Sequence, residues 1–180
     1  MQRRKPKPTL LFVDDLQSVH NYTSKVSRQI GAKKRTAFNP AQAEKIISQR
    51  LAAIQRLRIR LEGQASSSKN PKERKVLIGK INYLKQLKTK PFDLIISDVN
   101  MPHGFPVGVK FAEGVKKRYP GQKILMHSDD QHALDYLREK GIDYEVKRNQ
   151  HDNEAQLKQR LKQELWPKKF KRKQTDDDWY

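Results

Sequence analysis

Residues 92–102 read Phe92-Asp93-Leu94-Ile95-Ile96-Ser97-Asp98-Val99-Asn100-Met101-Pro102, an apolar run that ends in an acidic residue and a Met-Pro pair. An almost continuous apolar run of this length is typical of a strand buried on both faces of a parallel sheet. The same design recurs at residues 9–13, which precede a pair of aspartates, and at residues 123–127, which precede a serine. The sequence therefore predicts buried strands whose carboxyl ends carry polar side chains.

Helical patterns alternate with these strands, and each ends near a glycine or a proline, as helices commonly do. The predicted helices cover residues 17–30, 107–118, 131–140 and 153–166. Alternation of strand and helix predicts an α/β fold of the doubly wound kind, built on a parallel sheet.

Ligands of doubly wound sheets bind outside the carboxyl ends of the strands. The polar residues at these ends are Asp14, Asp15, Asp98, Ser128 and, after a fourth short run at residues 144–146, Lys147. Three carboxylates that converge on one spot repel each other unless a cation lies between them, and Mg²⁺ prefers such oxygen ligands. A lysine and a hydroxyl beside the metal suit the oxygens of a phosphate group. The strand ends therefore predict a magnesium and phosphate site.

These residues resemble the receiver domain of two-component response regulators. Residues 11–15 are similar to its first strand and acidic pair, and residues 93–102 to its phospho-acceptor strand with the following Met-Pro. Ser128 and Lys147 fall at the positions of its hydroxyl residue and its lysine. The resemblance covers roughly residues 9–39 and 91–166 and implies a five-stranded, flavodoxin-like parallel sheet.

The resemblance also implies roles for single residues. Asp98 would accept a phosphoryl group from a histidine kinase or a phosphotransfer protein, and Ser128 and Lys147 would contact the phosphoryl oxygens. Tyr144, three residues before that lysine, falls on the family's aromatic switch position. The expected function is therefore a stand-alone receiver that signals through a changed surface or through the basic hairpin described below, not an enzyme of ordinary turnover.

The implied cofactor is Mg²⁺. Asp15 and Asp98, with the main-chain carbonyl of Asn100, would hold the ion, and Asp14 would assist. The metal and the lysine would neutralise charge that develops on the phosphoryl group, so positioning would do most of the catalytic work.

Other interpretations of the same residues remain open. Asp14 and Asp15 are also suited to capping the helix that follows them. Asp129 and Arg148 stand where the family usually has a small residue and a proline, which favours a receiver-like scaffold that works by binding without phosphorylation. A haloacid-dehalogenase-type phosphatase is disfavoured because its Asp-x-Asp pattern is absent after the first strand.

A basic block separates the first part of this domain from the rest. Residues 32–90 hold sixteen Lys and Arg residues against three Glu, most of the net charge of +19. Apolar residues recur every three or four positions over residues 41–61 and again over residues 72–87, with a turn-rich connector between them. This pattern predicts an antiparallel helical hairpin inserted at residues 40–90 of a domain that spans residues 9–166.

The hairpin's excess of bases favours an anionic partner, either nucleic acid or an acidic protein, over solvated helix faces with no specific partner. Six bases are expected towards its tip: Arg56, Arg58, Arg60, Lys72, Arg74 and Lys75. A basic arm at residues 1–8 and a charged tail at residues 167–180, expected to be flexible, flank the domain.

Composition excludes several other classes. The chain of 180 residues suits one domain, and 35% hydrophobic residues require a core concentrated in part of it. The absence of cysteine excludes disulfide scaffolds and thiolate zinc sites. No apolar run is long enough for a membrane span or a signal peptide, so a soluble, cytoplasmic protein is expected.

Overall fold

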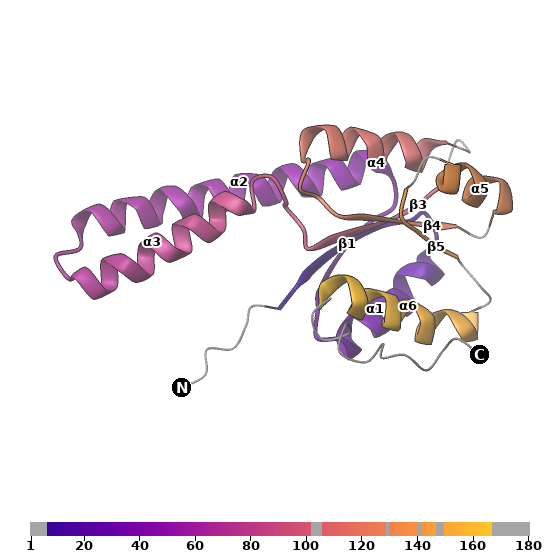
Figure 1. The fold of residues 1–180 in the computed structure, drawn as a ribbon, viewed down its shortest axis with the longest axis horizontal. Coiled ribbons are helices and arrows are strands. Elements are labelled where there is room, and N and C mark those ends of the chain that lie inside the picture. The colour runs from indigo at the N-terminus through magenta and orange to yellow at the C-terminus, as the bar shows by residue number, and fades with distance from the viewer. Residues whose placement is uncertain (1–6, 102–105, 129, 140–141, 147–149, 167–180) are drawn as a thin grey trace, which may run out of the picture.

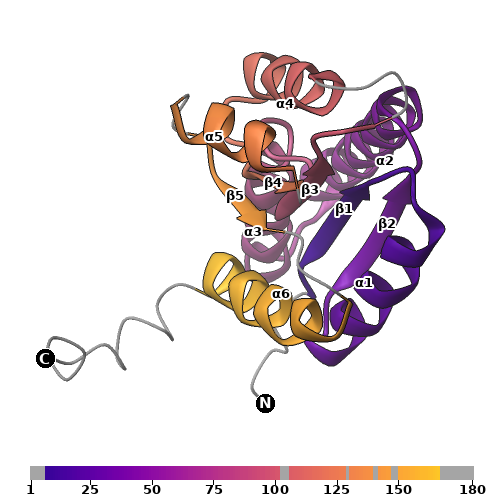
Figure 2. The ribbon, with the colours of Figure 1, turned by 90° about the vertical axis from the view of Figure 1, so that its right-hand side faces the viewer.

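A parallel sheet of five strands in the order β2-β1-β3-β4-β5 forms the centre of the molecule, with helices on both faces (Figures 1 and 2). The computed structural model describes residues 7–101, 106–128, 130–139, 142–146 and 150–166. The strands are β1 (Thr9–Val13), β2 (Lys33–Ala37), β3 (Leu94–Asp98), β4 (Ile124–Ser128) and β5 (Tyr144–Val146). The helices are α1 (Gln17–Gln29), α2 (Pro40–Ser67), α3 (Pro71–Gln86), α4 (Val107–Arg118), α5 (Gln131–Glu139) and α6 (Gln150–Leu165). The α/β fold with a parallel sheet, predicted from the sequence, is confirmed.

Each central strand contributes side chains to two cores, because successive residues of a strand point to opposite faces. Leu10 and Phe12 of β1 pack with residues of α1 and α6 on one face. Leu11 and Val13 pack with residues of α2, α4 and α5 on the other. Burial on both faces explains why these strands are apolar at almost every position.

The edge strand β2 was not located by the hydrophobic pattern, since it reads Lys33-Lys34-Arg35-Thr36-Ala37. Of these residues only Ala37 is buried. Gly31, with a φ of 71°, makes the left-handed turn that leads from α1 into the strand. Cations on an exposed edge also disfavour pairing with a second sheet.

Helix α2 is much longer than the sheet it covers. Its 28 residues span about 42 Å, whereas a five-residue strand spans about 17 Å. Ala43 and Ile47 pack on the sheet, and Arg50 reaches the main-chain oxygen of Pro91 just before β3 begins. The helix therefore leaves the sheet near Arg50, and Figure 1 shows it continuing beyond the amino-terminal ends of the strands.

Beyond that point α2 pairs with α3 to form an antiparallel arm, which we define as residues 51–88 (Figure 1). The arm has a small core of its own, separate from the two sheet cores: Leu61, Ala65, Leu77, Ile81 and Leu84. Asn39 and Asn70 cap α2 and α3 by accepting main-chain hydrogen bonds, and a proline follows each of them. None of the helices in the described part of the chain has both the length and the apolar composition of a membrane span.

Candidate functional site

Three aspartates meet at the carboxyl ends of the two central strands. Asp14 and Asp15 follow β1, and Asp98 ends the neighbouring strand β3. One carboxylate oxygen from each of the three lies within 4.8 Å of the others. Asp14 and Asp98 are only 2% and 5% exposed, whereas Asp15 is half-buried. The sequence placed these residues at strand ends, and the sheet order brings them together.

Asp14 is held by hydrogen bonds on several sides. Its main-chain nitrogen donates to Ala37 at 3.0 Å, and its Oδ1 accepts from the nitrogen of Leu16 at 3.0 Å. Leu16 is the N-cap of α1, and among the described residues no side chain makes a capping hydrogen bond to that helix. Helix capping, the alternative role open for this aspartate pair, is therefore not the role of Asp15.

His20 on α1 is a supporting residue that sequence reasoning missed. Its Nε2 donates to the main-chain oxygen of Asp14 at 2.7 Å, and its ring meets Phe38 edge-on at 4.5 Å between centroids. Burial lowers the pKa of His20, which favours the neutral ring. The contacts fix the loop that carries the acidic pair against the start of α2.

Lys34 is a half-buried basic residue of the edge strand β2. Its Nζ donates to Thr23 Oγ1 at 2.6 Å and to Ser24 Oγ at 3.0 Å, and lies 5.1 Å from the ring centroid of Phe12. Burial lowers the pKa of Lys34 to about 8, although the Asp14 carboxylate opposes the shift. Through these hydrogen bonds Lys34 links the edge strand β2 to α1.

Gly108 allows α4 to start against the end of β3. A Cβ at this position would lie 1.9 Å from the Asp98 main-chain oxygen and 2.9 Å from Val99 Cα. The Gly108 nitrogen donates to the oxygen of Val99 at 3.1 Å. Only a residue without a side chain fits so close to this backbone, a requirement invisible to hydrophobic periodicity.

Ser128 and Asn100 are joined through Asp130. Ser128, fully buried at the end of β4, accepts a hydrogen bond on Oγ from the Asp130 nitrogen at 3.1 Å. Asp130 Oδ2 accepts from Asn100 Nδ2 at 3.0 Å, and Oδ1 caps α5 by accepting from the nitrogen of His132 at 2.9 Å. The hydrogen bond from Asn100 lowers the pKa of Asp130. Asp130 thus contacts two residues that the sequence analysis assigned to the site, Ser128 through its main-chain nitrogen and Asn100 through its carboxylate.

Lys147 lies outside the described residues, as do Asp129 and Arg148. The main chain of Tyr144 belongs to β5, but its side chain is also outside the described part. The roles expected for Lys147 and Tyr144 therefore stay predictions.

The six bases expected at the hairpin tip lie on the arm, beyond the opposite ends of the strands from the acidic cluster (Figure 1). Arg58 is half-buried and pairs with Glu62 at 3.5 Å. The other five are exposed: Arg56, Arg60, Lys72, Arg74 and Lys75. Arg58 lies two residues from Arg56 and Arg60, a spacing that sends its side chain to another side of α2.

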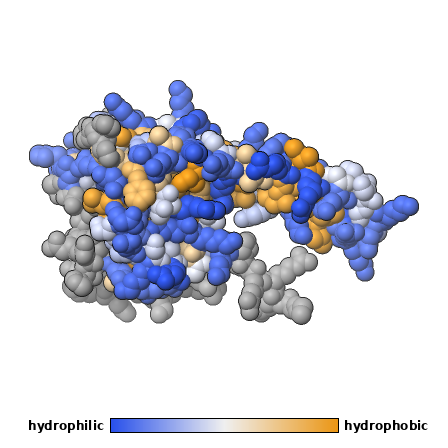
Figure 3. Space-filling model, turned by 180° about the vertical axis from the view of Figure 1, so that it is seen from behind, coloured by the Kyte–Doolittle hydropathy of each residue, from blue (hydrophilic) through white to orange (hydrophobic). Residues whose placement is uncertain are grey.

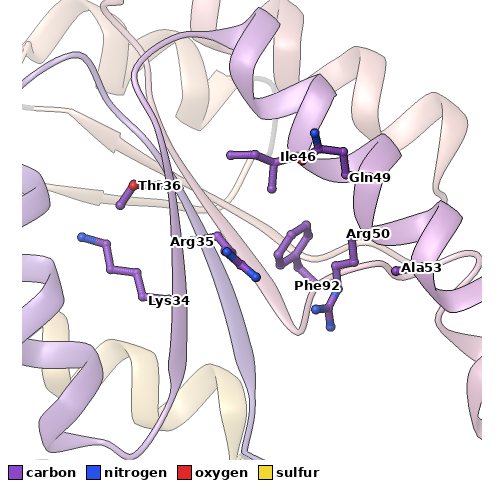
Figure 4. Close-up of a pocket in the computed structure, with 8 residues that line it drawn as sticks. All are labelled: Lys34, Arg35, Thr36, Ile46, Gln49, Arg50, Ala53 and Phe92. Carbon is purple, nitrogen blue, oxygen red and sulfur yellow. The ribbon is translucent and has the colours of Figure 1, made fainter.

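A cavity of about 440 Å³ lies between β2 and α2, away from the acidic cluster (Figure 4). Arg35 and Arg50 approach Phe92 there, while Lys34 points to the other side of β2. The Arg50 guanidinium carbon is 4.8 Å from the Phe92 ring centroid, and burial lowers the pKa of Arg50. Arg50 also holds Pro91, so this cavity marks the junction where α2 leaves the sheet.

The fold resembles that of response regulator receiver domains. A signal receiver domain of an HD domain-containing protein from Pseudomonas fluorescens superposes with a TM-score of 0.56 and 15% identity, covering 97% of this chain and 98% of that chain. The response regulator TrrA from Thermotoga maritima, in complex with Mg²⁺ and a beryllofluoride group, gives 0.55 and 20%, covering 88% and 99%. A CheY-like receiver domain from Methanospirillum hungatei gives 0.55 and 16%, covering 92% and 99%.

No family model matches the sequence, and no curated protein does. Likeness at this level of identity establishes the fold, which is that of a receiver domain. The resemblance recognised in the sequence is thus confirmed for the fold.

Proposed function

We propose that the chain is a receiver domain that accepts a phosphoryl group on Asp98 in a Mg²⁺-dependent reaction. The observation that carries the proposal is the meeting of Asp14, Asp15 and Asp98, each with a carboxylate oxygen within 4.8 Å of the others. The fully buried Ser128 ends the next strand of the sheet. The donor would be a histidine kinase or a phosphotransfer protein, as for receivers in general.

The reaction needs little beyond positioning. An oxygen of Asp98 attacks the phosphorus, the bond between phosphorus and the donor's imidazole nitrogen breaks, and the imidazole leaves with the bonding electrons. Burial of Asp98 limits competing water, and the residue ends a central strand. Ser128 Oγ and the ammonium of Lys147 would donate hydrogen bonds to the phosphoryl oxygens.

The acidic residues present fit Mg²⁺. Three carboxylates this close repel one another, and a small cation that prefers oxygen ligands relieves the repulsion. Asp15, Asp98 and the main-chain oxygen of Asn100 would hold the ion, with Asp14 beside them. When bound, it supplies positive charge against the transferred group. The Asp130 contact holds the Asn100 side chain and thereby steadies that part of the main chain.

The test is reaction with acetyl phosphate and Mg²⁺, followed by mass spectrometry for an aspartyl phosphate that hydroxylamine cleaves. We expect the wild type to be labelled and Asp98→Asn to be unlabelled, because the amide lacks the nucleophilic oxygen. Asp93→Asn is the matched control, since Asp93 lies at the other end of the same strand and accepts a hydrogen bond from the Thr9 nitrogen at 2.7 Å.

Labelling of Asp98→Asn at the wild-type level would contradict the assignment. If the folded wild type is not labelled and does not bind beryllofluoride, the chain is instead a receiver-like scaffold that works by binding.

A further inference from the structure

The arm exposes an unusual share of apolar side chains. Among the described residues, seven large hydrophobic side chains are exposed, and five of them lie on the arm. They are Leu57 (39%), Ile59 (57%), Val76 (39%), Ile78 (45%) and Tyr83 (47%). Figure 3 shows apolar surface between hydrophilic side chains along the arm. Where exposed apolar side chains are contiguous, they mark interaction surfaces.

Two cavities open on the same side of the arm. One, of about 530 Å³, lies near its base between α2, the end of α3 and the end of α4, where Leu51, Leu84 and Tyr119 line it. The other, of about 260 Å³, lies near the tip, where Ala65 and Ile81 line it. The α2 residues that line them include a series at spacings of three and four: Gln55 and Arg58 in the first, Glu62 and Ser66 in the second. Residues so spaced share one face of a helix, so the two cavities lie in line along one side of the arm, which we call the groove.

Ile78 lines this groove, and the helical position of Ile59 places it beside the groove. Ile78 lines the cavity near the tip, and Ile59 lies four residues after Gln55 and three before Glu62, between the two cavities. Leu57 and Val76 each lie two residues from these isoleucines, about 200° away around their helices. The arm thus carries one pair of exposed apolar residues at the groove and a comparable pair away from it.

Cations border the groove with little compensation. Residues 51–88 hold ten Lys and Arg residues and two Glu. Within the described residues, the one ion pair inside the arm is that of Arg58 with Glu62. Arg74 lines the groove near the tip, and Lys85 and Lys88 line it towards the base. A ligand here meets an apolar floor and basic edges.

We propose that this groove binds an acidic amphipathic helix of a partner protein. From Leu51 to Ala65 the groove is about 21 Å long, which matches a helix of about four turns. Apolar side chains of that helix would cover Ile59 and Ile78, and its acidic residues would face Arg74, Lys85 and Lys88. Nucleic acid is a poorer fit to the groove, because its phosphate backbone supplies negative charge but no apolar contacts. A second copy of this chain is also a poorer fit, because each copy carries a net charge of +19 and the two repel each other. The inference does not depend on phosphorylation of Asp98.

The experiment is fluorescence anisotropy with the full chain and three labelled probes. The first is a helical peptide of about 15 residues with Leu at i, i+3, i+4 and i+7 spacing and Glu elsewhere. The second is a peptide of the same composition in an order that destroys the apolar face, and the third is a short random DNA duplex. The variant Ile59→Gln/Ile78→Gln removes the apolar floor without a change of charge, and Leu57→Gln/Val76→Gln is its matched control. Gln is a good helix former, and circular dichroism checks that the arm stays helical.

We expect the amphipathic peptide to bind at least tenfold more tightly than the reordered peptide. The groove variant should lose at least tenfold in affinity for the amphipathic peptide, whereas the control should stay within twofold. If the groove variant loses helicity, Arg74→Gln/Lys85→Gln replaces it and should weaken the same peptide. Equal binding of the two peptides, or equal losses in the two Gln pairs, would overturn the proposal. Binding of the duplex without binding of the amphipathic peptide would also overturn it and assign the arm to nucleic acid.

Discussion

Gly108 shows how much of the candidate site depends on backbone packing. The acids and Ser128 were predicted because each follows an apolar strand, and strand ends can be recognised in the sequence. Gly108, His20 and Asp130 were not, because their roles depend on distances between α1, β3, α4 and α5 that no local pattern encodes. A glycine between Val107 and Val109 resembles any weak point in a helix until the Asp98 oxygen is found beside it.

Gly108→Ala should destabilise the domain and disturb the acidic cluster. The new Cβ would overlap the Asp98 main-chain oxygen, so α4 or the end of β3 must shift. We expect a loss of about 1–3 kcal/mol in the free energy of unfolding, typical of overpacking. Denaturant unfolding measures it.

Gly114→Ala, in the same helix, is the control. A Cβ at Gly114 meets nothing closer than the Arg118 guanidinium at 3.9 Å. That substitution should stabilise the protein by about 0.5–1 kcal/mol, because alanine is the better helix former. If both substitutions stabilise the protein, Gly108 does not lie as close to the Asp98 main-chain oxygen as described.

Lys34 should titrate well below an ordinary lysine, at a pKa of about 8, because burial disfavours its charged form. Between that value and about 10.4 the unfolded chain keeps the proton that the folded chain has lost. The free energy of unfolding contributed by Lys34 should therefore rise with pH across this window and stay level below it. NMR titration of the lysine side chains measures the pKa directly.

The matched comparison for Lys34 is the pH dependence of stability in the wild type and in Lys34→Met. The rise above pH 8 should be smaller in the variant, because the depressed group is gone. Identical pH profiles would mean that Lys34 is not buried as described.

At the scale of elements, the apolar strands and the amphipathic helices were predictable, and β2 was not. The helices α2 and α3 can be predicted because Leu and Ile recur along one face of each. Asn39 and Asn70 cap their starts. Strand β2 has three cations in its five residues, because an edge strand buries little and needs no apolar run. Its identity as a strand depends on pairing with β1 along its whole length, which is a tertiary property.

Asn70→Ala should loosen the arm while leaving the sheet intact. Asn70 Oδ1 accepts hydrogen bonds from the nitrogens of Lys72 at 3.0 Å and Glu73 at 3.4 Å, and their loss costs about 1 kcal/mol. Hydrogen exchange should become about fivefold faster in α3 and stay unchanged in β1 and β3. Asn82→Ala, at an exposed position inside α3, should not accelerate exchange. Acceleration throughout the sheet would show that arm and sheet open together.

For the whole molecule, the separate cores predict that the arm is dispensable for folding. The arm core contains no residue of the sheet cores, and Arg50 meets Pro91 where the arm begins and ends. Replacing residues 54–87 with a short Gly-Ser linker should leave a domain that unfolds in one cooperative transition. The same replacement should abolish binding of the amphipathic peptide. Circular dichroism melting and anisotropy measure the two effects, and failure of the shortened chain to fold would contradict the separation.

Because α2 is one continuous helix that belongs to both the sheet domain and the arm, a rigid rotation of the helix moves both of its ends. The pivot of such a rotation is Arg50, which donates a hydrogen bond to Pro91 and packs on the Phe92 ring. About 15 Å of helix lie on the side of Pro40 and about 26 Å on the side of Ser67. A rigid rotation that displaces Pro40 by about 1 Å therefore swings Ser67 by about 1.7 Å in the opposite sense. Pro40 lies two residues after Phe38, which contacts His20 and through it the loop of Asp14. In a rigid helix of this geometry, a displacement beside the acidic cluster would be larger at the far end of the molecule.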